Sequence, residues 1–166
     1  MDYTAATRIQ LAVLNPMLKI GKPELSRQML GSVRVPKRSM IVMPEWGETC
    51  NSFLDAVKKH PSKASSGYYF KTNADYFDKM FRSLRVISKA MRPSAAAVLV
   101  VQDSYYKEVH NDLPTVVRKM TSVHGLKLRR QENFQLSKTL AGSHPHTKRY
   151  RKSFEATEAV LCFEKV

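Results

Sequence analysis

Residues 95–101 have the sequence Ala-Ala-Ala-Val-Leu-Val-Val, and the polar residues Gln102, Asp103 and Ser104 follow them. A continuous apolar run without polar alternation is typical of a strand that is covered on both faces in a parallel sheet. The change to polar residues marks the carboxyl end of this strand. We therefore expect a buried strand of an α/β domain at residues 95–101.

The segments on either side of this run have helical periodicity. Before it, apolar residues recur every three or four positions from residue 72 to residue 91, Thr72 and Asp75 have the spacing of a capping box, and Pro93 ends the pattern. After it, a helix is expected from Leu113 to His124. This second helix has Asp112 as its cap and Gly125 as its stop.

The remaining segments complete the expected order of elements. We predict strands at residues 126–136 and 158–163, helices at residues 4–14, 24–30 and 48–60, and basic loops at residues 33–39 and 141–152. Helices that alternate with strands predict an α/β fold with a mostly parallel sheet. Because such sheets usually have about five or six strands, residues 1–166 are expected to form one partial domain. It has a helical and loop segment at residues 1–70 and an α/β segment at residues 71–166.

The composition predicts a folded, strongly basic chain. The 166 residues include 28 Lys and Arg against 14 Asp and Glu, a net charge of +14, and 43% are hydrophobic. This charge suits nucleic acid, an anionic membrane or an acidic protein, although a basic surface that binds nothing is also compatible with it. No apolar run has the roughly 18 residues of a membrane span, and no signal peptide is visible. A cytoplasmic protein without a membrane partner is therefore expected.

The two cysteines and one histidine pair do not predict a metal or redox site. Cys50 and Cys162 lack the spacing of a zinc or disulfide motif, so each is expected to be a small buried hydrophobe. His144 and His146 flank a proline and have no third ligand nearby. We expect no metal site.

Three segments carry candidate functional residues. Gln102, Asp103, Ser104 and Lys107 follow the buried strand, where ligands bind in open α/β sheets, although Asp103 and Ser104 could instead only cap or turn the chain. Two basic loops suit contact with nucleic acid phosphates but would also suit a solvated surface. Their cations are Arg34, Lys37 and Arg38 in the first loop, and Lys148, Arg149, Arg151 and Lys152 in the second.

No complete catalytic motif accompanies these residues. The sequence contains neither a glycine-rich GxGxxG loop nor a phosphate-binding GxxxxGK[ST] loop, and it has no Ser/His/Asp or HExxH arrangement. By composition, Asp2, Tyr3 and Arg8 belong to an ordinary polar helix start. The residues by themselves therefore leave the activity open.

Four pieces of the sequence, in this order, resemble the downstream half of the DNA amino-methyltransferases, the cytosine-N4 and adenine-N6 DNA methylases. They are Met1-Asp2-Tyr3-Thr4-Ala5-Ala6-Thr7 continuing to Leu11-Ala12-Val13-Leu14, Met29-Leu30-Gly31-Ser32, Ser62-Lys63-Ala64-Ser65-Ser66-Gly67-Tyr68-Tyr69, and Val100-Val101-Gln102-Asp103-Ser104-Tyr105-Tyr106-Lys107. The resemblance covers nearly the whole chain. One departure is Pro93-Ser94-Ala95, where the family has Pro-Gly-Gly before the buried strand.

The resemblance implies a function and a partial Rossmann-like methyltransferase fold. Such enzymes transfer a methyl group from S-adenosylmethionine to an amino group of a base that is flipped out of the DNA duplex. Asp2, Tyr3 and Arg8 would then line the pocket for the base, Gln102, Asp103 and Ser104 would lie near it, and Lys107 and the basic loops would hold DNA.

The resemblance also implies an incomplete enzyme. The family's glycine-rich cofactor motif and its Ser-Pro-Pro-Tyr catalytic motif would precede Met1, and the chain would supply only the last three of seven strands. S-adenosylmethionine is therefore not expected to bind this chain alone. The unpaired edge of the strand at residues 98–101 would favour a complementary chain or self-association. The alternative is an inactive remnant that binds DNA or a partner.

Overall fold

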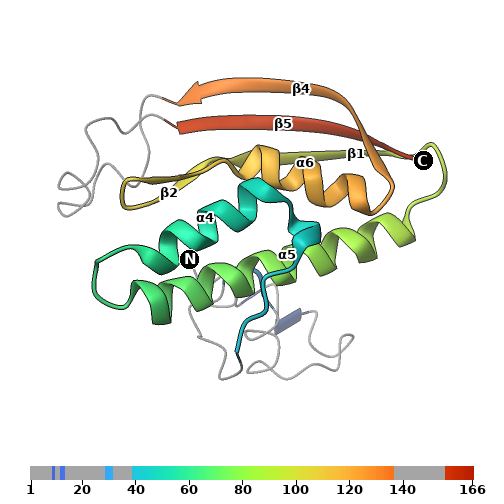
Figure 1. Ribbon diagram of the computed structural model, residues 1–166. Coiled ribbons are helices and arrows are strands. Elements are labelled where there is room, and N and C mark those ends of the chain that lie inside the picture. The colour runs from blue at the N-terminus through green and yellow to red at the C-terminus, as the bar shows by residue number, and fades with distance from the viewer. Residues whose placement is uncertain (1–8, 10–11, 14–28, 32–38, 137–155) are drawn as a thin grey trace.

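The computed structural model describes residues 9, 12–13, 29–31, 39–136 and 156–166 (Figure 1). This part contains both helices and strands, as expected for a mixed α/β fold. The elements are η1(Pro44–Trp46), α4(Glu48–Lys59), η2(Ser65–Tyr69), α5(Phe70–Ala90), β1(Ala96–Gln102), β2(Ser104–Tyr106), β3(Val109–Asn111), α6(Leu113–Val123), β4(Leu126–Leu136) and β5(Ala156–Lys165).

The main sheet is antiparallel, so the prediction of a mostly parallel sheet was wrong. Its strand order is β1-β5-β4, and the last strand, β5, pairs in antiparallel orientation with both neighbours. β1 and β4 consequently run in the same direction, as the helical connection through α6 predicts, but they do not pair with each other. Periodicity could not reveal that β5 inserts between them, because strand order depends on contacts that are distant in sequence.

β1 is buried on one face only, which corrects a second expectation. Its exposure alternates along the strand: Val98 and Val100 are 60% and 59% exposed, whereas Leu99 and Val101 pack against the core. The continuous apolar run therefore does not correspond to two covered faces. Within the described part of the chain, helices cover only the face of the sheet that carries Leu99.

Three helices cover that inner face. α6 lies directly against the sheet, and α4 and α5 lie beyond it (Figure 1). The helices and the inner face of β5 share one hydrophobic core. Its fully buried large side chains include Trp46, Leu54, Val57, Phe77, Val116, Val117, Met120, Leu161 and Phe163.

The predicted helix ends were confirmed for α6 but not for the start of α5. Asp112 caps α6, its Oδ1 accepting the backbone N–H of Thr115 at 3.1 Å, and Gly125 with φ 73° follows the end of the helix, as predicted. The capping box at Thr72 was wrong. α5 begins at Phe70 as a continuation of the π-helical turn η2, and the hydroxyl of Thr72 instead donates to the carbonyl of Tyr68 at 2.8 Å.

The cysteines differ in their surroundings. Cys50 is completely buried, as expected, and burial raises the pKa of its thiol to about 12. Cys162 is half-buried on the middle strand, so the expectation of a buried hydrophobe was wrong for it. Both thiols are free.

Candidate functional site

Asp103 ties the carboxyl end of β1 to β5. Its backbone N–H donates to the carbonyl of Thr157, and its Oδ1 accepts the N–H of Thr157, both at 2.9 Å. Its Oδ2 lies 2.9 Å from Nε2 of His110. Both carboxylate oxygens of Asp103 are therefore engaged inside the protein.

The segment after Asp103 is a hairpin rather than a simple turn. β2 pairs with β3, and Ser104 faces Asn111 across it, its hydroxyl accepting the side-chain N–H of Asn111 at 2.9 Å. Lys107 lies between the two strands with φ 55°. Sequence reasoning missed this hairpin because each of its strands has only three residues.

Two of the four sequence pieces that carry the resemblance are in contact at this end of β1. We call the contact between residues 60–69 and 103–110 the motif junction. The hydroxyls of Ser65 and Tyr106 are 2.6 Å apart and buried, and the ammonium of Lys107 donates to the hydroxyl of Ser62. The rings of Tyr69 and Tyr106 lie 5.1 Å apart.

His60 and Glu108 extend the motif junction, and sequence reasoning did not identify either. Nδ1 of His60 accepts the N–H of Ser62 at 3.1 Å, so Nε2 carries the proton that it donates to Glu108 at 2.8 Å. The pKa of Glu108 is lowered, most strongly by a hydrogen bond from its own backbone N–H and next by this bond to His60. Because the two residues are 48 positions apart in sequence, no local pattern links them.

Internal hydrogen bonds occupy two of the titratable side chains of the motif junction. His60 is bonded through both nitrogens, and Asp103 through both oxygens. Outside these bonds, the junction presents aromatic surface to solvent, since Tyr68 and Tyr69 are each 40% exposed and Tyr105 is 37% exposed. Its geometry suits holding β1, β5 and the segment 60–69 together.

The other predicted site residues lie outside the described part of the chain. They are Asp2, Tyr3 and Arg8 for the base pocket, and Arg34, Lys37, Arg38, Lys148, Arg149, Arg151 and Lys152 for DNA. Of the predicted positions, the structure therefore places only Gln102, Asp103, Ser104 and Lys107. Asp103 and Ser104 bond separately within the hairpin, to His110 and Asn111, and only Lys107 bonds to the segment 60–69, at Ser62.

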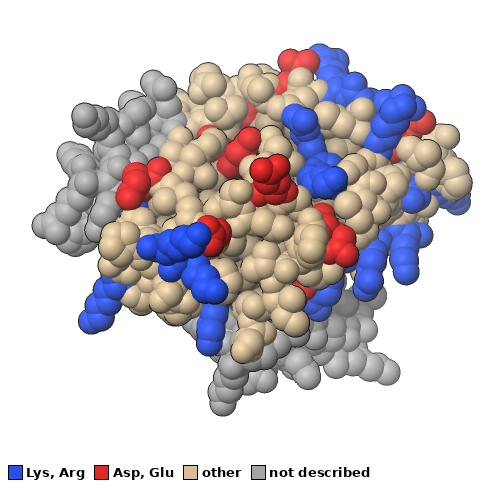
Figure 2. Space-filling view, in the orientation of Figure 1, with Lys and Arg blue, Asp and Glu red and all other residues tan. Residues whose placement is uncertain are grey.

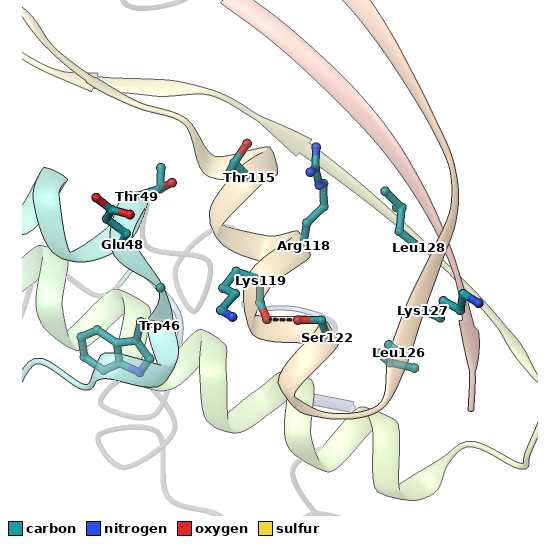
Figure 3. Close-up of a pocket in the computed structure, with 11 residues that line it drawn as sticks. Trp46, Glu48, Thr49, Thr115, Arg118, Lys119, Ser122, Leu126, Lys127 and Leu128 are labelled. Carbon is teal, nitrogen blue, oxygen red and sulfur yellow. Dashed lines mark hydrogen bonds between the residues drawn. The ribbon is translucent and has the colours of Figure 1, made fainter.

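A second feature lies at the other end of the sheet. A hollow of about 640 Å³ opens between the start of α4, the exposed side of α6 and the start of β4 (Figure 3). We call it the α6 hollow. Its charged lining residues are Glu48, Arg118, Lys119 and Lys127. Figure 2 shows Lys and Arg side chains in two areas of this face, a larger one at the upper and right side and a smaller one at the lower left.

The described residues form neither a metal centre nor a membrane-spanning helix. No group of three or more His, Cys, Asp or Glu in this part could hold a metal ion. None of its helices is long and apolar enough to cross a membrane.

Comparisons with known proteins do not extend this description. No protein-family model, no curated protein and no solved structure matches the chain.

Proposed function

We propose that this chain is the downstream part of a DNA amino-methyltransferase and acts with a second polypeptide that carries the cofactor site. The observation that carries this proposal is the motif junction. Ser65 and Tyr106 come from two sequence pieces that resemble the family independently, and their side chains make a buried hydrogen bond across 41 positions. The resemblance thus falls on residues that contact one another in the fold.

We infer that the described part does not hold S-adenosylmethionine by itself. At the carboxyl end of β1, where a ligand of an α/β sheet is expected, both oxygens of Asp103 are bound to Thr157 and His110. No glycine-rich loop is present in the sequence. We therefore assign no step of methyl transfer to these residues, and their proposed role is to hold the strand end beside which the second polypeptide docks.

The sheet supports the need for a second polypeptide. We interpret β1, β5 and β4 as the last three strands of a larger Rossmann-like sheet. Among the described residues, β1 pairs only with β5 and leaves its other edge unpaired. An uncharged, unpaired edge is a template for another strand, and the sequence of β1 contains no charged residue.

The mass and sequence of the complex recovered from the native cell would test this proposal. We expect a second chain that contains a glycine-rich loop and a Ser-Pro-Pro-Tyr motif, and transfer of tritiated methyl from S-adenosylmethionine to DNA by the complex only. By calorimetry, the isolated chain is expected not to bind S-adenosylmethionine. Stoichiometric binding by the isolated chain would contradict the incomplete-enzyme proposal.

An inactive remnant that binds DNA or a partner is the second candidate. It is favoured by the full internal bonding of Asp103 and His60, which engages both side chains in holding the motif junction together. A complex whose partner lacks both methyltransferase motifs, or a chain recovered without a partner, would favour this candidate.

A further inference from the structure

The α6 hollow combines cations and hydroxyl groups from separate elements. Arg118 and Lys119 come from α6, and Lys127 comes from the start of β4. Thr49, Thr115 and Ser122 add side-chain hydroxyls. Guanidinium, ammonium and hydroxyl groups are the side-chain groups that contact nucleic acid phosphates.

Arg118, Lys119 and Lys127 form no ion pair within 4 Å among the described residues, although Lys127 faces Glu164 across the β4–β5 pair and its charge helps to lower the pKa of that carboxyl. Elsewhere in this part, cations near acids form ion pairs, such as Lys59 with Asp55 at 2.7 Å and Arg82 with Asp78 at 2.9 Å. Arg118 instead donates only to the side-chain oxygen of Gln131, at 3.3 Å. The charges of Arg118 and Lys119 are therefore available to an external anion, against a single lining carboxylate, that of Glu48, whereas Lys127 also interacts with Glu164.

The accessible lining does not suit an amphipathic peptide. Two of its three large apolar members are buried, because Trp46 is 0% and Leu126 is 1% exposed. A peptide would need exposed apolar anchors to bind tightly, and only Leu128 is partly accessible here. A ligand that enters the hollow meets mainly charge and hydroxyl groups.

The directions of the three cations favour an extended polyanion over a single phosphate. In Figure 3, Arg118 extends past Thr115, Lys119 points towards Trp46, and Lys127 points away from the hollow beyond Leu126. Side chains that diverge around a rim cannot close on one phosphate group. They can contact successive phosphates along a backbone.

Gly47 fixes the position of one of these cations. It has φ +90°, a conformation that glycine adopts without strain, and a Cβ at this position would lie 2.5 Å from Cγ of Lys119. The aliphatic stem of Lys119 therefore lies directly on the backbone that leads into α4. This packing holds its ammonium group at the rim of the hollow.

We propose that the α6 hollow binds the phosphate backbone of DNA. The hollow lies where β4 begins, at the opposite end of the sheet from the motif junction, because β1 and β4 run in the same direction. This proposal depends on the proposed function in one respect, which is the choice of DNA as the polyanion. Its test requires no methyl transfer, so failure of the methyltransferase proposal and failure of this one give different results.

The test is the salt dependence of binding to a fluorescein-labelled DNA duplex, measured by fluorescence anisotropy. The triple variant Arg118→Gln, Lys119→Gln, Lys127→Gln should lower the magnitude of the slope of log K against log salt by about 2 to 3, since each phosphate contact contributes about 0.9. At physiological salt its affinity should fall at least about tenfold.

The matched control variant is Arg85→Gln, Lys89→Gln, Arg92→Gln, which removes three positive charges from exposed positions outside the hollow and the motif junction. We expect it to lower the affinity less than about threefold, since its lost charges act only through the general field. Both variants should keep the wild-type circular dichroism and melting curve. An equal loss in the two variants, or no DNA binding by the wild type, would overturn the proposal.

Two further probes separate alternative ligands. Inorganic phosphate that saturates the wild type at submillimolar concentration, but not the Arg118 triple variant, would indicate a single-phosphate site and overturn the backbone proposal. Polyglutamate that binds as tightly as DNA with the same sensitivity to these substitutions would indicate an acidic protein partner and overturn it as well. We expect neither result.

Discussion

The two edges of the main sheet are built differently. β4, at one edge, carries Lys127, Arg129, Arg130 and Glu132, and its register shifts between Leu128 and Arg130. β1, at the other edge of the described sheet, has neither a charged residue nor a register shift. Charges and bulges are the devices by which natural proteins keep an edge strand from pairing further. β4 thus has features that hinder pairing with a further strand, and β1 has none of them.

This difference suits the two edges to two different roles, docking of another strand at β1 and contact with a polyanion at β4. The charges of β4 are partly neutralised within the sheet, because Arg129 contacts Glu164 at 2.6 Å and Arg130 contacts Glu132 at 2.8 Å. β1 presents Val98 and Val100 beside its free backbone edge. The contrast supports a docking edge at β1 and, through Lys127, a polyanion-binding edge at β4.

The largest expected effect comes from the strand that both edges share. Phe163 on β5 is 1% exposed and belongs to the core. Phe163→Ala should lower the free energy of unfolding by about 3–5 kcal/mol, since it removes a large buried side chain and leaves a cavity. Urea denaturation measures this loss. Phe134→Ala on β4, where the ring is 52% exposed, is the control, and an equal loss in both would contradict the assignment of inner and outer faces.

The next effect concerns the anchor of β1. Asp103→Ala removes the acceptor of the Thr157 N–H and the partner of His110, so the free energy of unfolding should fall by about 1–3 kcal/mol. Hydrogen exchange should increase most at the carboxyl end of β1 and the start of β5. The exposed neighbouring change Gln102→Ala should stay within about 0.5 kcal/mol of wild type. A uniform increase in exchange over the whole domain would contradict a local anchor.

Adding charge to β1 tests whether the chain self-associates through the edge of this strand. Without a completing strand, the wild-type chain should self-associate at high concentration through this edge. Val98→Lys with Val100→Lys should weaken that association at least tenfold, about 1.4 kcal/mol, because two ammonium groups would flank the edge. Sedimentation velocity at physiological salt measures the change.

The control for this experiment adds the same charge elsewhere. Val86→Lys with Ile87→Lys lies on α5, where these side chains are 63% and 43% exposed. It should leave self-association within a factor of about two of wild type, because the added charge acts only through the general field. Equal weakening by both double variants would show that β1 is not the associating edge.

The smallest expected effect is a pH dependence at the turn that leads into β4. The pKa of His124 is lowered chiefly by burial and further by the charges of Arg85 and Lys165, while its bond to the carbonyl of Phe81 acts in the opposite direction. In the unfolded chain the pKa should be near 6.5, so the unfolded state binds more protons below that pH. The contribution of His124 is thus complete above about pH 6.5 and is lost as the pH falls through the lowered value.

This dependence is measurable as a lower urea midpoint at pH 5.5 than at pH 7.5. His124→Gln, which can still donate to the carbonyl of Phe81, should reduce the difference between the two midpoints. An unchanged difference would assign the pH dependence to other groups.

Much of the fold followed from local patterns. The helix at residues 113–124 was predicted with its cap at Asp112 and its stop at Gly125, because capping is a contact between near neighbours in sequence. The strand at residues 126–136 was predicted with the bounds of β4. The start of α5 was misplaced because Thr72 bonds back to Tyr68, a contact that competes with the predicted capping box.

The candidate site was less predictable. Asp103 was identified by its place after an apolar run, but its partner Thr157 is 54 positions away. His60 and Ser65 gave no local signal, because their partners Glu108 and Tyr106 lie on a hairpin that is distant in sequence. The α6 hollow was missed entirely, since its lining comes from the starts of α4 and β4 and from one side of α6.

The sequence by itself determined the types and approximate bounds of most described helices and strands and the excess of positive charge. These follow from residue spacing, capping chemistry and composition, which act locally or over the whole chain. Only the tertiary structure decided that β5 inserts between β1 and β4, that one face of β1 is open, and that Arg118, Lys119 and Lys127 share one hollow. Each of these depends on contacts between distant segments, which local periodicity does not encode.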